Sequence, residues 1–84
     1  MLNNKSLLIT GGTGSLGKML TKTILSKYPK IKRLVIFSRD EQKQFQMSQE
    51  FPEKKYPSIR YFIGDVRDEK RLETALDNID YVIH

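Results

Sequence analysis

The sequence contains no cysteine, and its one histidine is the last of its 84 residues. Without cysteine, neither a disulfide framework nor a cysteine-based metal site can reinforce the fold. With a single histidine, a zinc site is close to excluded as well. No apolar run approaches the roughly 18 residues of a membrane span, and the N-terminus lacks the pattern of a signal peptide. We therefore expect a cytoplasmic protein with no metal site and no membrane partner.

Positive charge is in excess, since 15 lysines and arginines against 10 aspartates and glutamates give a net charge of +5. This balance suits an anionic partner such as a nucleotide phosphate, a nucleic acid or a membrane surface. The basic residues are scattered, however, and adjacent pairs occur only at Lys32-Arg33, Lys54-Lys55 and Lys70-Arg71. A nucleic-acid interface usually concentrates its basic residues on one element. We therefore expect no nucleic-acid partner.

Short apolar runs recur along the chain with helical spacing between them. Runs without polar alternation predict strands buried on both faces of a parallel sheet. These runs are Leu7–Ile9, Leu34–Phe37, Tyr61–Ile63 and Tyr81–Ile83.

Three helices are expected between these strands. The first ends before Pro29, which cannot continue a helix. The second is capped by Ser38 or Asp40 and stops at Pro52, and the third begins after Asp68. The residues expected to face inward are Leu16, Leu20, Thr23 and Ile24 in the first helix, Phe45, Met47, Ser48 and Phe51 in the second, and Leu72, Ala75 and Leu76 in the third.

This alternation predicts an α/β fold of the Rossmann type, a doubly wound parallel sheet, because parallel crossover connections are right-handed. In the usual arrangement the four strands lie in the order 3-2-1-4, which leaves the fourth strand as an open edge. Whole proteins avoid an uncovered apolar edge. We therefore expect residues 1–84 to be the N-terminal part of an NAD(P)-binding Rossmann domain, with the remainder of a larger protein beyond His84.

A glycine-rich run with the spacing Gly11-x-x-Gly14-x-x-Gly17 follows the first strand and opens the first helix. The first glycine permits a sharp turn, the second leaves space for a pyrophosphate, and the third lets the helix lie close against the sheet. The helix N-terminus offers free N–H groups to phosphates, and Thr13 and Ser15 can add hydroxyl donors. The run predicts a dinucleotide-binding loop, with a ligand-free glycine turn as the alternative.

The residues after the second strand bear on the choice of cofactor. An acidic residue here usually holds a free ribose 2′-hydroxyl, whereas an arginine accommodates a 2′-phosphate. This chain has Ser38 and Arg39, and Lys43 lies one helical turn further on. The sequence therefore favours NADP over NAD. The alternative is that Arg39 and Lys43 only form surface ion pairs with Asp40 and Glu41, which would contribute little.

The third strand is followed by Gly64-Asp65-Val66. A carboxylate at this place can accept a hydrogen bond from the adenine amino group, and the next backbone N–H can reach the ring. Alternatively, Asp65 merely caps a turn. No Tyr-x-x-x-Lys pair is placed for hydride chemistry, and His84 is given no role, so we assign no catalytic residue.

Three blocks of sequence together resemble the UDP-N-acetylglucosamine 4,6-dehydratases of the extended short-chain dehydrogenase/reductase superfamily, which include CapD-like polysaccharide biosynthesis proteins. The blocks are Leu8–Gly17, Phe37–Glu41 and Phe62–Asp68. The resemblance covers essentially the whole chain and is strongest to the inverting type that acts in pseudaminic acid synthesis.

The resemblance implies a lyase with bound NADP and the nucleotide-sugar substrate UDP-N-acetylglucosamine. In such enzymes the sugar is oxidised at C4, water is lost across C5 and C6, and the hydride returns to C6, with inversion at C5. Thr13 to Leu16 would hold the pyrophosphate, Ser38 to Lys43 the region of the 2′-phosphate, and Asp65 and Val66 the adenine. The family's catalytic Asp-Lys pair and Tyr-x-x-x-Lys motif lie beyond the fourth strand, outside these residues.

We therefore expect a homo-oligomeric enzyme whose catalytic residues lie elsewhere. Another NADP-dependent nucleotide-sugar epimerase or dehydratase, and a non-catalytic NADP-binding module, are the alternatives. The candidate cofactor-binding residues are Gly11, Thr13, Gly14, Ser15, Leu16, Gly17, Ser38, Arg39, Asp40, Glu41, Gln42, Lys43, Asp65 and Val66.

Overall fold

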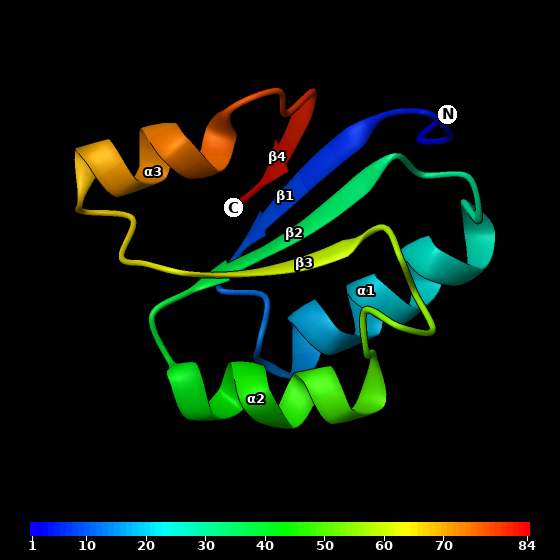
Figure 1. The fold of residues 1–84 in the computed structure, drawn as a ribbon, viewed down its shortest axis with the longest axis horizontal. Helices are drawn as coiled ribbons and strands as arrows, with labels where there is room; N and C mark the ends of the chain where they lie inside the picture. The colour runs from blue at the N-terminus through cyan, green and yellow to red at the C-terminus, as the bar shows by residue number, and fades with distance from the viewer.

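A computed structural model describes all of residues 1–84, and its elements alternate as predicted (Figure 1). They are β1 (Ser6–Thr10), α1 (Ser15–Lys27), β2 (Arg33–Ser38), α2 (Glu41–Glu50), β3 (Ile59–Ile63), α3 (Glu69–Leu76) and β4 (Tyr81–Ile83). The third strand begins two residues earlier than the apolar run indicated, at Ile59.

The four strands form one parallel sheet in the order β3-β2-β1-β4, which confirms the predicted topology. In the register of the sheet, Leu8 of β1 lies opposite Val35 of β2 and Val82 of β4, and Val35 lies opposite Arg60 of β3. Figure 1 shows α1 and α2 on one face of the sheet and α3 on the other. The carboxyl ends of the strands therefore meet at one edge, between the two helix layers.

The core is divided by the sheet, because successive residues of a strand point to opposite faces. Leu7 and Ile9 of β1 belong to the larger cluster under α1 and α2, whereas Leu8 belongs to the smaller cluster under α3. The larger cluster consists of Leu7, Ile9, Ile24, Ile31, Leu34, Ile36, Met47, Phe51 and Ile59. The smaller one consists of Leu8, Val35, Phe37 and Ala75.

The inward face of α1 differs from the prediction. Leu16 is 68% exposed and Thr23 also lies at the surface, so both were wrongly expected to face inward. The residues that α1 buries are Gly17, Thr21 and Ile24. The helix is rotated in this way because its closest approach to the loop before it occurs at a glycine, where no side chain separates the two backbones.

The inward face of α2 differs as well. Phe45 is 66% exposed, which contradicts the prediction, whereas the polar neighbour Gln44 is only 4% exposed. Met47 and Phe51 are buried, as predicted. An amide side chain at the inward position has to be compensated by hydrogen bonds, and Gln44 makes several to the sheet beneath it.

The fourth strand was expected to be buried on both faces, and this prediction is wrong, because all three residues of β4 are exposed. Tyr81, Val82 and Ile83 are 49%, 50% and 37% exposed. The cause is that β4 pairs only with β1 and forms one edge of the sheet, as the predicted topology requires.

The three helices begin in two different ways. Asp40 and Asp68 cap α2 and α3, and each carboxylate accepts a hydrogen bond from a backbone N–H of the first turn. Of the two predicted caps of α2, the structure therefore selects Asp40 over Ser38. The N-cap residue of α1 is Gly14, which has no side chain to act as a cap. None of the three helices combines the length and apolar character that crossing a bilayer requires.

Candidate functional site

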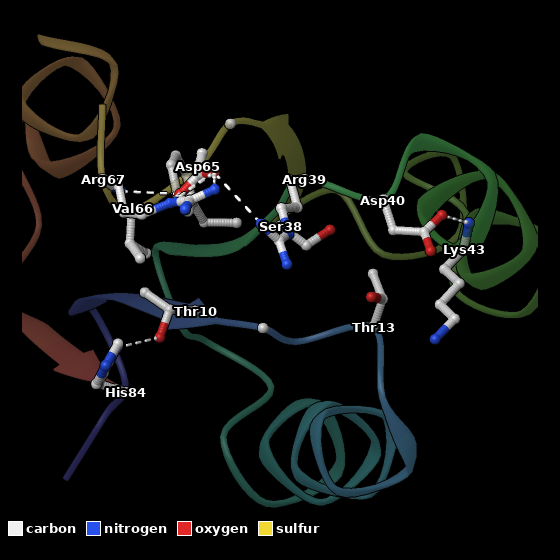
Figure 2. A pocket seen from close by; sticks show the side chains of 13 residues that line it. Thr10, Thr13, Ser38, Arg39, Asp40, Lys43, Asp65, Val66, Arg67 and His84 are labelled. Atoms are coloured by element: carbon white, nitrogen blue, oxygen red, sulfur yellow. Dashed lines mark hydrogen bonds and ion pairs between the residues drawn. The ribbon is translucent and has the colours of Figure 1, made fainter. Parts of the chain in front are cut away.

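A cavity of about 760 Å³ lies over the carboxyl ends of β1, β2 and β3 (Figure 2). In open α/β sheets this edge is where ligands bind. Its lining residues are Thr10, Gly11, Thr13, Phe37, Ser38, Arg39, Asp40, Lys43, Gly64, Asp65, Val66, Arg67 and His84. In Figure 2, Thr10 and Thr13 lie on one side of the cavity, and Asp65 and Arg67 lie on the opposite side. Lys43 lies next to Asp40, away from Asp65.

The cavity brings together residues from all three segments that the sequence singled out. The predicted residues that line it are Gly11, Thr13, Ser38, Arg39, Asp40, Lys43, Asp65 and Val66. The predicted residues that do not line it are Gly14, Ser15, Leu16, Gly17, Glu41 and Gln42. The cavity therefore lies mainly over the ends of β2 and β3, while the start of α1 lies beside it.

Five lining residues were not among the candidates: Thr10, Phe37, Gly64, Arg67 and His84. Thr10 ends β1 and His84 directly follows the adjacent strand β4, and Thr10 Oγ1 lies 2.7 Å from His84 Nδ1. Arg67 could have been found from its place two residues after Asp65, because side chains at that spacing in a loop can hydrogen-bond.

The glycine loop has the sharp turn predicted at its first glycine, whereas its third glycine has a different close partner from the one predicted. Gly11 has a φ of +64°, a left-handed conformation that favours glycine. A side chain on Gly17 would lie 2.5 Å from the Cα atom of Gly12 and still closer to its carbonyl group. The close partner of α1 is thus the backbone of the loop, rather than the sheet itself. At Gly14, by contrast, the nearest atom to an added Cβ is the Gly11 carbonyl oxygen at 4.0 Å.

The N-terminus of α1 is open to an anionic ligand. The backbone N–H groups of Ser15, Leu16 and Gly17 make no hydrogen bond to any acceptor of the chain. In α2 and α3 the capping aspartates satisfy one such group each and place a negative charge beside the helix end. An uncapped helix of this length presents free donors and a partial positive charge, which suit a phosphate group.

The basic residues after β2 do not form the surface pairs that were considered as an alternative. Arg39 is 72% exposed along its side chain and pairs with Asp65, at 3.5 Å from Nη1 to Oδ2, instead of with Asp40 or Glu41. Lys43 makes no ion pair, and the Asp40 carboxylate accepts a hydrogen bond from the backbone N–H of Lys43 instead. Close to Ser38 in the chain, Lys43 is therefore without an ion pair and Arg39 has one long ion pair.

Asp65 is held by the side chain and the backbone of Arg67. Arg67 Nη2 donates to Asp65 Oδ2 at 2.8 Å, Arg67 Nε reaches both carboxylate oxygens, and the Arg67 N–H donates to Oδ1 at 2.9 Å. These bonds, first those of the side chain, hold the pKa of the Asp65 carboxyl well below its usual range, and the charge of Arg39 adds to the effect. The carboxylate in turn raises the pKa of Arg67.

We expect the low pKa of the Asp65 carboxyl group to depend on Arg67. In an Arg67→Ala variant the pKa of Asp65 should rise toward its ordinary value of 3.8. Because the folded-state pKa is depressed, the stabilisation by this pair is complete above the unfolded value and is lost as the pH falls through the folded value. The stability difference between wild type and variant should thus be constant above about pH 5 and shrink below about pH 4.

Carbon NMR of the Asp65 carboxyl group, together with thermal unfolding at several pH values, measures both effects. Arg60→Ala is the matched control, because Arg60 pairs with Glu53 at 3.9 Å and lines no part of this cavity. An Asp65 titration that is the same in wild type and Arg67→Ala would contradict the assignment.

The loop after β3 keeps a free hydrogen-bond donor at the cavity. The backbone N–H of Val66 has no acceptor in the chain. The Asp65 carboxylate already accepts four hydrogen bonds from Arg67, so a ligand donor would have to share one of its oxygens. Polar groups after β3, cations after β2 and the free N–H groups of α1 together describe a site for an elongated, phosphate-bearing ligand.

Comparison with known proteins finds one matching family and several similar proteins. Residues 7–84 match the family described as polysaccharide biosynthesis protein. The chain is 54% identical over its whole length to a Campylobacter jejuni protein named UDP-N-acetylglucosamine 4,6-dehydratase (inverting), of which it spans 24%. It is 42% identical to a Rickettsia massiliae protein named UDP-glucose 4-epimerase, with all of this chain and 24% of that protein covered.

Among solved structures, the X-ray structure of Pen from Bacillus thuringiensis matches the whole chain with a TM-score of 0.88 and 42% identity. The match covers 25% of that protein. The chain thus spans about a quarter of the length of the proteins that it matches.

Proposed function

The chain belongs to the polysaccharide biosynthesis protein family, and from this membership we propose that it is the NADP-binding part of a nucleotide-sugar 4,6-dehydratase. The substrate that we propose for the intact enzyme is UDP-N-acetylglucosamine, which the name of the Campylobacter relative specifies. The observation that carries the proposal is the meeting of the glycine loop, the Arg39 segment and the Asp65 segment at one cavity.

The residues present fit a dinucleotide with a 2′-phosphate. The free N–H groups at the start of α1, beside the open space at Gly14, would bind the pyrophosphate. Arg39 and Lys43 would bind the 2′-phosphate, the first through its planar fork and the second as a compact charge. Asp65 and the N–H of Val66 would bind the adenine. The Asp65 carboxylate is paired with Arg67 and Arg39, so its negative charge is offset within the site.

When bound, NADP would supply the acceptor for the hydride from the sugar C4 and return it to C6. The residues described here contribute to that reaction by binding and orientation. Their N–H groups and cations would fix the cofactor at the carboxyl edge of the sheet, and Asp65 would fix its adenine end. In this proposal, the groups that move protons at C4, C5 and C6 lie in other parts of the enzyme. The same is true of the groups that would invert C5.

The proposal is tested with the full-length protein and UDP-N-acetylglucosamine, followed by proton NMR. Loss of water with return of the hydride to C6 converts the C6 hydroxymethyl group to a methyl group, so a new methyl signal is expected. Without added cofactor the signal should still appear if NADP copurifies, because the cofactor is regenerated in each turnover. No methyl signal under any of these conditions would contradict the dehydratase assignment.

The second candidate is an epimerase, which the Rickettsia relative favours at 42% identity. An epimerase would change the configuration of the sugar at C4 and leave C6 untouched. Incubation with UDP-glucose in the same NMR experiment would then produce a second hexose spectrum without a methyl signal.

A homo-oligomer and a cytoplasmic location are also part of the proposal for the intact enzyme. Sedimentation of the full-length protein tests the oligomeric state.

A further inference from the structure

Gln44 is a buried polar residue that lies behind the cavity wall. It is 4% exposed and does not line the cavity. Its Nε2 lies 2.9 Å from Ser38 Oγ and 2.9 Å from the carbonyl oxygen of Phe62. The carbonyl oxygens of Ser38 and Ile36 lie at 3.3 and 3.4 Å. One amide nitrogen of α2 thus joins the ends of β2 and β3.

The orientation of this amide is determined by its neighbours. Three of the four oxygens around Nε2 are backbone carbonyls, which can only accept hydrogen bonds. If the amide were turned over, Gln44 Oε1 would face these three acceptors and make no bond to any of them. In the orientation that is present, Oε1 has no hydrogen-bond partner although it is buried. The hydrogen bonds of Nε2 therefore offset the unfavourable burial of Oε1.

The consequence reaches the cavity through Ser38. Because Ser38 Oγ accepts a hydrogen bond from Gln44, its own hydrogen is directed elsewhere, and no acceptor in the chain takes it. Ser38 lines the cavity, as does its chain neighbour Arg39. The serine hydroxyl is therefore available to the cavity as a donor, next to a guanidinium group. A phosphate oxygen, which carries charge and accepts several hydrogen bonds, is the acceptor that suits this pair.

We propose that Gln44 is a positioning residue for cofactor specificity, which holds the Ser38 hydroxyl as a donor toward a 2′-phosphate. This inference rests on the proposed NADP site and deepens it. Without the amide, the Ser38 hydrogen could turn to one of the carbonyl oxygens that Gln44 now occupies, such as that of Phe62. The hydroxyl would then offer the cavity only lone pairs, which repel a phosphate.

The test replaces Gln44 by methionine, which is unbranched and of similar size but cannot donate, in the full-length protein. Calorimetric titration should show NADP affinity reduced about tenfold, the effect of one hydrogen bond to a charged group, and NAD affinity changed less than about threefold. Gln46→Met is the matched control, because Gln46 is exposed on the same helix and should leave both affinities unchanged. A purely structural role of Gln44 would instead lower both affinities by the same factor, and that result would overturn the proposal.

A second variant keeps the proposal testable if Gln44→Met folds poorly. Ser38→Ala removes the hydroxyl and should lower the NADP-to-NAD affinity ratio by a similar factor, about tenfold. In the double variant the two losses should not add, since they act through one hydrogen bond. An unchanged ratio in Ser38→Ala, or full additivity, would show that the hydroxyl is not the link. If wild type itself shows no preference for NADP, the proposed cofactor is wrong, which is a separate outcome from the failure of Gln44.

Discussion

Alanine at position 17 should destabilise the protein more than any other single methyl group added to the glycine loop. The added Cβ would lie 2.5 Å from the Cα atom of Gly12 and closer still to its carbonyl group, and neither can move without opening the loop or tilting α1. Overpacking of this kind costs about 3 kcal/mol. The gain in helix propensity, about 1 kcal/mol, does not compensate. Against a typical stability of about 5–15 kcal/mol, the loss is large.

Thermal and urea unfolding of the full-length variant measure this effect, and Gly14→Ala is its control. Gly14 has a φ of −76°, which alanine adopts readily, and no atom lies closer than 4.0 Å to the added Cβ. We expect Gly14→Ala to change stability by less than about 1 kcal/mol. Its methyl group would nevertheless occupy the proposed pyrophosphate space, so NADP affinity should fall about tenfold or more. Equal stability losses at the two positions would contradict the packing described here.

Replacement of Arg39 by alanine should produce the largest change in cofactor preference. The side chain is 72% exposed, and its one ion pair, with Asp65, is long at 3.5 Å, so its removal should hardly affect stability. A guanidinium group bound to a phosphate contributes more, about 2–3 kcal/mol. NADP affinity should therefore fall about 30- to 150-fold, while NAD affinity changes by less than about threefold.

Titration of both cofactors into wild type, Arg39→Ala and Arg60→Ala checks this expectation. Arg60 is also exposed, but it lies near Glu53 and outside the cavity, so its loss controls for the change in net charge. Lys43→Ala should have a smaller effect than Arg39→Ala, about fivefold, because an ammonium group binds phosphate without the paired geometry of arginine. If Arg39→Ala weakens NADP and NAD equally, the residue does not read the 2′-position.

The order of the strands could be predicted from the sequence because few topologies are compatible with apolar runs joined by right-handed crossovers. The position of the glycine loop then identified the edge at which the site lies. The faces of the helices were harder, since polar and apolar spacing in α1 allows two rotations that differ by one residue. The contact between Gly17 and Gly12 selects one of them, and that contact joins two backbones without any apolar side chain.

Gln44 was overlooked for a related reason. A glutamine among other glutamines indicates a solvent-facing surface, and Phe45 beside it indicates the core. In the structure Gln44, and not Phe45, takes the inward position, because its amide donates hydrogen bonds to groups at the ends of β2 and β3. Arg67 was overlooked because its partner, Asp65, had already been given a role toward adenine. The spacing of Asp65 and Arg67 permits this pair, and the geometry of the loop decides that it forms.

The different beginnings of the three helices also decide which way round a dinucleotide can lie. Asp40 and Asp68 each occupy one free N–H group at the N-termini of α2 and α3, so on the proposed function the uncapped α1 would receive the central phosphates. The Arg39 and Asp65 segments would then accept the adenosine half on one side, and the other half would extend toward β4. In the reversed orientation the 2′-phosphate would lie away from both cations. The two aspartates thus give the groove a polarity, although neither has to touch the reacting end of the ligand.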